Sequence, residues 1–68
     1  PKEELLGLAE SNYLELNSDK AGHFYEEAMK KYPDDIKLLT SYGNFLFSIK
    51  EINLAEKILE RARAIDPL

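Results

Sequence analysis

The chain has 68 residues, a formal net charge of −4, one histidine and no cysteine. A chain this short forms one small domain, and it has neither the thiols for a disulfide framework nor the ligands for a zinc site. Its acidic balance, without a basic stripe, argues against direct nucleic-acid binding, and its apolar runs are too short to span a membrane. We therefore expect a soluble helical protein, intracellular and most simply cytoplasmic, with no cofactor and no metal. Because the chain opens on Pro1, we also expect it to be an excised or processed segment.

The first half of the chain predicts two helices. Apolar and small residues recur at helical spacing from Leu5 to Leu16, and again through residues 20–32. The polar residues 17–19 offer an N-cap for the second helix, and Pro33 stops it.

The second half predicts two more helices. Helical spacing returns at residues 39–46 and 54–65, and either aspartate of residues 34–35 can cap the third helix. Asn53, with Glu56 three residues later, resembles a capping box at the start of the fourth helix. No run alternates with period two, so no sheet is expected. The sequence therefore predicts an all-α chain of two tandem antiparallel helix-turn-helix hairpins.

The two halves repeat each other at an offset of 34 residues, the difference between Pro33 and Pro67. At this offset small residues fall on small residues, and large apolar residues fall on large apolar residues. The matched pairs are Ala9 with Gly43, Ala21 with Ala55, Tyr25 with Leu59, and Ala28 with Ala62. Two packed helices approach closely only where a small residue stands at the crossing, so the first two pairs mark the expected crossings of the hairpins.

This pattern resembles the tetratricopeptide repeat (TPR), whose motif has a 34-residue period. The second half fills each signature position by class, with Leu39, Tyr42, Gly43, Leu46, Ala55, Leu59, Ala62 and Pro67. The first half fills them with Leu5, Leu8, Ala9, Ala21, Tyr25, Ala28 and Pro33, but has Asn12 where a large apolar residue belongs. Leu16 and Lys50 replace the usual turn glycines. Half-a-TPR (HAT) repeats of RNA-processing factors are a near neighbour. The resemblance implies one domain, residues 1–68, with repeats at 2–34 and 36–68 that form a fragment of a right-handed superhelix.

The resemblance also implies a groove for a peptide or partner protein, lined by the first helix of each repeat. Its positions here are Leu6, Glu10, Tyr13, Leu14, Lys37, Thr40, Asn44 and Phe47. In chaperone-binding members, Lys and Asn side chains from these rows hold a C-terminal carboxylate; here Glu10 would repel it, which argues against a clamp for chaperone tails. An apolar floor of Leu6, Tyr13 and Phe47 favours an apolar or amphipathic peptide. The alternative is that Tyr13 and Phe47 only pad a thin core.

Positions that differ in polarity between the repeats indicate which faces meet a neighbour. Glu4, Ser11 and Glu15 correspond to Leu38, Phe45 and Ile49, so the first helix is interpreted as a solvated end. On the fourth helix, Leu54, Ile58, Ile65 and Leu68 replace mostly polar counterparts and form an apolar stripe. Such a stripe predicts a homodimer contact or a missing capping helix, unless the chain folds back over it.

Catalysis is not expected. The serines have no histidine or paired acid at a plausible spacing, His23 is interpreted as a solvated helix position, and the aspartates at 34–35 as caps. The sequence therefore predicts a non-catalytic protein-interaction or scaffold module. The alternatives are a homo-oligomerisation unit that uses the stripe and a HAT-like scaffold in an RNA-processing complex.

Overall fold

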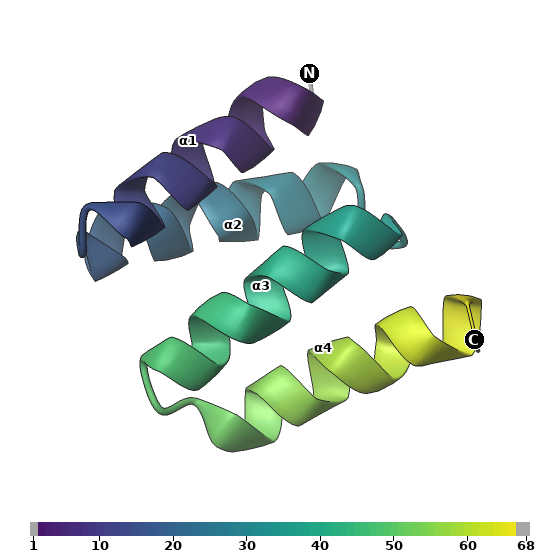
Figure 1. Ribbon diagram of the computed structural model, residues 1–68. Coiled ribbons are helices and arrows are strands. Elements are labelled where there is room, and N and C mark those ends of the chain that lie inside the picture. The colour runs from purple at the N-terminus through teal and green to yellow at the C-terminus, as the bar shows by residue number, and fades with distance from the viewer. Residues whose placement is uncertain (1, 67–68) are drawn as a thin grey trace. The chain divides into compact units, whose positions relative to one another are not determined.

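The computed structural model describes residues 2–66, and within this range the chain forms four α-helices and no strand (Figure 1). The helices are α1 (Lys2–Leu14), α2 (Ser18–Lys31), α3 (Ile36–Ser48) and α4 (Ile52–Ile65). None of these helices is long and apolar enough to cross a membrane. The prediction of an all-α chain is confirmed.

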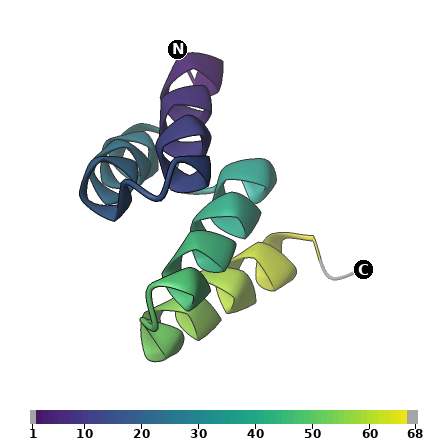
Figure 2. The same ribbon diagram turned by 60° about the vertical axis from the view of Figure 1, so that its left-hand side comes forward.

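The chain divides into two compact units, which we call unit 1 (residues 1–33) and unit 2 (residues 34–68). In unit 1, α1 packs against α2, and in unit 2, α3 packs against α4, as both views show (Figures 1 and 2). The connections are only residues 15–17 and residues 49–51, so the chain must reverse at once. Each unit is therefore an antiparallel helical hairpin, as the sequence predicts.

Both hairpin turns close in the same way, although neither contains glycine. Leu16 and Lys50 have φ angles of 63° and 69°, in the left-handed region. In unit 1, the Leu16 amide donates to the Tyr13 carbonyl (3.0 Å), and the Asn17 amide donates to the Asn12 carbonyl (2.8 Å). The pattern of these two bonds is a Schellman motif, which requires one left-handed residue.

Unit 2 repeats this motif 34 positions later, with Lys50 in the place of Leu16. The Lys50 amide donates to the Phe47 carbonyl (3.1 Å), and the Glu51 amide donates to the Leu46 carbonyl (2.9 Å). The two hairpin turns therefore have the same geometry, although neither contains glycine.

Small residues stand where the helices of each hairpin meet, as predicted. Ala9 and Ala21 in unit 1 and Ala55 in unit 2 are fully buried. Gly43 is buried as well, and a Cβ atom added to it would lie 2.6 Å from Cδ2 of Leu59. This is shorter than a van der Waals contact, so the approach of α4 to α3 depends on the absence of a side chain at Gly43.

The two units differ in how much apolar side chain they bury. The buried apolar residues of unit 1 are Leu6, Ala9, Ala21, Tyr25 and Ala28. Those of unit 2 are Leu38, Leu39, Tyr42, Phe45, Leu46, Ala55, Ile58 and Ala62. Three of the five in unit 1 are alanines, so within the described residues unit 2 holds the larger apolar core.

The helix starts agree with the sequence in part. Asp35 caps α3, since its side chain accepts a hydrogen bond of 2.9 Å from the Leu38 amide. Asn17 stands at the N-cap of α2, but its side chain makes no capping bond. The predicted capping box of Asn53 with Glu56 is wrong, because α4 begins at Ile52 with Glu51 as its N-cap. The turn ends at Glu51, so Asn53 already lies inside the first helical turn.

Candidate partner-binding surfaces

The four predicted groove residues of α1 do not share one environment. Leu14 is 81% exposed, Glu10 and Tyr13 are half-buried, and Leu6 is buried in the core. Leu6 precedes the buried Ala9 by three residues, so it lies on the same helical face. The prediction that Leu6 forms part of an open groove floor is therefore corrected, and Leu14 is the exposed apolar residue of this row.

The four predicted groove residues of α3 all reach solvent. They are Lys37, Thr40, Asn44 and Phe47, whose spacing of three, four and three residues places them on one helical face. The Thr40 hydroxyl donates to the Ile36 carbonyl (2.9 Å). Among the described residues, the Asn44 amide has no hydrogen-bond partner, so it can both donate and accept. Phe47 is 37% exposed. This face therefore combines a cation, an unpaired amide and an aromatic ring.

Phe47 also borders a depression of about 350 Å³ within unit 2. Its other lining residues all come from α4 and are Glu56, Leu59, Glu60 and Arg63. Phe47 and Leu59 supply apolar walls, and charges of both signs surround them. Phe47 is a predicted site residue, whereas its α4 neighbours are not, although their spacing of three, one and three residues marks a single helical face.

The apolar stripe predicted on α4 is interrupted. Leu54 and Ile65 are exposed, but Ile58 is only 9% exposed and belongs to the core. Ile58 follows Ala55 by three residues and precedes Ala62 by four, so it shares the buried face of these two alanines. Leu68 lies outside the described residues. The exposed apolar surface of α4 is therefore Leu54 and Ile65 together with Ile52, which the sequence reasoning did not include.

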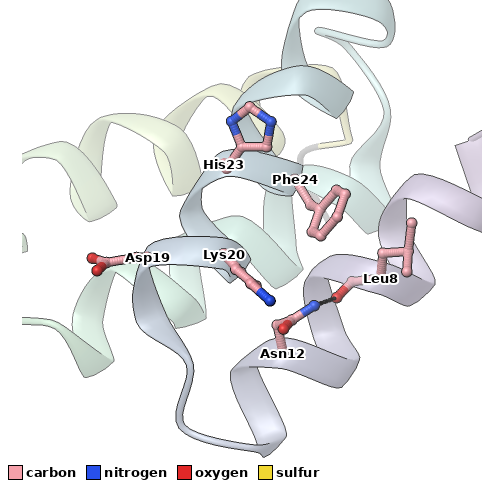
Figure 3. Close-up of a pocket in the computed structure, with 6 residues that line it drawn as sticks. All are labelled: Leu8, Asn12, Asp19, Lys20, His23 and Phe24. Atoms are coloured by element: carbon pink, nitrogen blue, oxygen red, sulfur yellow. Dashed lines mark hydrogen bonds between the residues drawn. The ribbon is translucent and has the colours of Figure 1, made fainter.

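A hollow of about 530 Å³ lies on unit 1 between α1 and α2 (Figure 3). It is lined by Leu8, Asn12, Asp19, Lys20, His23 and Phe24. The Asn12 side chain donates to the Leu8 carbonyl (2.8 Å), so it folds back on its own helix. This hollow is not among the predicted sites, although the sequence carries a signal for it: Asn12 occupies the position where the repeat pattern has a large apolar residue.

His23 and Asp34, which were candidates for catalysis or metal binding, each interact with a side chain of their own unit. His23 is exposed, lies 3.6 Å from the Glu27 carboxylate, and has its ring edge-on to Phe24. Asp34 forms an ion pair of 3.0 Å with Arg61. Within the part of the chain that the structure describes, no three histidine, cysteine or acidic side chains gather into a potential metal site.

Comparison with known proteins found no match: no family model, no curated protein and no solved structure matches the chain. The fold and its surfaces define the class of molecule, an all-α chain of two helical hairpins.

Proposed function

We propose that the chain is a non-catalytic protein-interaction module of the TPR type, which binds a peptide or partner protein through the first helix of each hairpin. The observation that carries this proposal is the exposed face of α3. There the Asn44 amide, which has no hydrogen-bond partner among residues 2–66, is available to a peptide backbone, and Phe47 offers a partly exposed ring. Aromatic anchors beside available hydrogen-bonding groups are typical of surfaces that hold peptides.

The ligand that suits these faces is an apolar or amphipathic peptide. Leu14 of unit 1 and Phe47 of unit 2 are exposed and can receive apolar side chains, and Lys37 favours an acidic residue in the peptide. Glu10 lies on the corresponding face of α1 and disfavours an acidic chain terminus. A clamp for the C-terminal tails of chaperones is therefore not part of the proposal.

Selection of a displayed random peptide library against the chain tests this function. We expect enrichment of peptides with large apolar residues, and we expect Phe47→Ala to raise their Kd by at least about 10-fold, because an anchor at an interface contributes at least ~1.4 kcal/mol. Asn44→Ala should weaken them less. Ile65→Lys on α4 is the matched control and should leave their affinity unchanged. Failure to enrich any peptide, or equal binding by the Phe47 variant, would contradict the proposal.

The second candidate is a homo-oligomerisation unit that uses α4, and its support is the exposure of Ile52, Leu54 and Ile65. Here Ile65→Lys should abolish self-association while Phe47→Ala spares it, and sedimentation equilibrium distinguishes the two. A HAT-like scaffold in an RNA-processing complex would use the same protein-binding surfaces and differs only in its partner.

A further inference from the structure

The hollow of unit 1 lies at a position that buried apolar side chains fill in unit 2. At the offset of 34 residues, Leu8, Asn12 and Phe24 correspond to Tyr42, Leu46 and Ile58. The three residues of unit 2 are all buried, whereas Leu8 is 46% exposed and Asn12 and Phe24 are half-buried. Asparagine in place of leucine thus leaves unit 1 short of one apolar side chain at this site. A binding partner can place an apolar side chain of that size in the hollow.

The walls of the hollow specify the chemistry of its occupant. Leu8 and Phe24 provide apolar surface from opposite helices (Figure 3). The Lys20 side chain points across the hollow towards Asn12, whereas the Asp19 carboxylate points away from it (Figure 3). Lys20 has no carboxylate partner within the described residues. The hollow therefore fits an apolar side chain that carries a carboxylate next to it.

The hairpin turn of unit 1 carries exposed leucines next to a carboxylate. Leu16 is 87% exposed and Leu14 is 81% exposed, which are the two highest values among the exposed large apolar residues. Glu15 lies between them and has no cationic partner within the described residues. Leu16 also has a φ of 63°, a conformation that is costly for leucine and that glycine would adopt freely. The Leu16 backbone closes the turn, but its exposed side chain adds no packing to its own unit.

We propose that the hollow binds Leu16 of a second copy of the chain, with Glu15 of that copy beside Lys20. The side chain of Leu16 stays in solvent in its own unit, so it does not fill its own hollow. Since unit 1 of each copy has one turn and one hollow, a two-fold axis lets each copy insert its Leu16 into the hollow of the other. This contact uses neither the peptide-binding faces of α1 and α3 nor the exposed apolar surface of α4, and it does not depend on the proposed function.

Two substitutions test the contact without damaging the fold. Asn12→Leu fills the hollow with the residue found at the corresponding position of unit 2, and Leu16→Gly removes the inserted side chain while relieving the backbone strain. Both variants should melt at a higher temperature than the parent at dilutions where each is monomeric. Sedimentation equilibrium of the 68-residue chain up to about 1 mM should show a dimer whose Kd rises at least about 100-fold in either variant, since each removes two leucine contacts per dimer.

A charge exchange tests the orientation of the insert. Glu15→Lys and Lys20→Glu should each weaken the dimer by roughly 10-fold, and the double variant should restore it. Ile65→Lys is the matched control and should have no effect. A monomer at every concentration, a dimer unchanged by Asn12→Leu and Leu16→Gly, or a charge exchange without recovery would each overturn the proposal. A dimer lost only in Ile65→Lys would instead assign self-association to α4.

Discussion

Lys50 shows what a single residue contributes to the stability of a hairpin turn. Its φ of 69° costs an L-residue about 1–2 kcal/mol, and glycine avoids this cost. Glycine loses more chain entropy on folding, which offsets about 0.5–1 kcal/mol of the gain. We expect Lys50→Gly to raise the free energy of unfolding by roughly 0.5–1 kcal/mol, measured by denaturant titration.

Lys50→Ala is the control for this prediction, because alanine keeps the Cβ atom that causes the strain. It should leave the free energy of unfolding within about 0.5 kcal/mol of the parent. Equal effects of glycine and alanine would show that the left-handed turn is not a source of strain.

Two of the three helical glycines, Gly7 and Gly43, lead to opposite predictions. Alanine is the better helix former by about 1 kcal/mol, and a Cβ atom at Gly7 meets nothing within 4 Å, so Gly7→Ala should stabilise the chain by about that amount. At Gly43 the added atom would lie 2.6 Å from Cδ2 and 2.7 Å from Cγ of Leu59. Gly43→Ala should therefore destabilise by roughly 1–2 kcal/mol despite the better propensity.

A double variant isolates the cause of the Gly43 effect. In a Leu59→Ala background the obstructing atoms are gone, so Gly43→Ala should become stabilising. Thermal unfolding of the four proteins of this cycle checks the change of sign. A destabilisation that persists in the Leu59→Ala background would contradict the contact between α3 and α4 at this position.

Helical spacing in the sequence is enough to correct the assignment of two predicted site residues. Leu6 and Ile58 each lie three residues from a buried alanine of their own helix, which assigns them to the buried faces. The groove positions that the TPR resemblance implies misplace Leu6, and comparison of the two repeats misplaces Ile58, because neither considers the buried face of the residue's own helix. The exposure of Leu8 could not have been inferred in this way, because it depends on the side chains that the neighbouring helix happens to supply.

At the scale of the element, the adjacent aspartates before α3 have different roles. Asp35 accepts the Leu38 amide at 2.9 Å as the N-cap, whereas Asp34 forms an ion pair with Arg61 in which both side chains are largely exposed. We expect Asp35→Ala to lower the free energy of unfolding by about 1 kcal/mol. Asp34→Ala should lower it by less than about 0.5 kcal/mol, since solvent screens an exposed pair.

Helicity by circular dichroism and denaturant titration check this pair of variants. Equal losses for the two would contradict the assignment of Asp35 as the cap.

The start of α3 was predictable because an aspartate stood before an apolar run. The start of α4 was not, because its first residue is set by the hydrogen bond from the Glu51 amide to the Leu46 carbonyl, which closes the preceding turn.

At the scale of the whole molecule, the unequal cores of the two units should produce unequal local stability. Unit 1 buries mainly alanines beside Leu6 and Tyr25, whereas unit 2 buries several large apolar side chains. We expect the amides of α1 and α2 to exchange with solvent at least about 10-fold faster than those of α3 and α4, because less apolar surface resists local opening. Native-state hydrogen exchange measures this difference. Equal protection in all four helices would show that the chain opens only as a whole.

The architecture was more predictable than the surfaces. The period of 34 residues, the small residues at the crossings and the short connections together determine two helical hairpins, and Ala9 with Ala21 alone locate the first crossing. The surfaces depend on how far one helix covers the next, which varies with the size of each facing side chain. Asn12 shows this best, since one polar side chain that folds back on its own helix borders a hollow that no periodicity describes.

The absence of glycine from the two hairpin turns also affects how the chain meets proteases. Glycine offers a protease no side chain to recognise, whereas Leu16 suits enzymes with an apolar specificity pocket and Lys50 suits those that cleave after basic residues. Both residues are exposed in short connections between helices, where proteolytic nicking concentrates. A protease that cleaves after basic residues therefore finds a site in the connection of unit 2 and none in residues 15–17, so the turn of unit 2 can be cut while that of unit 1 stays whole.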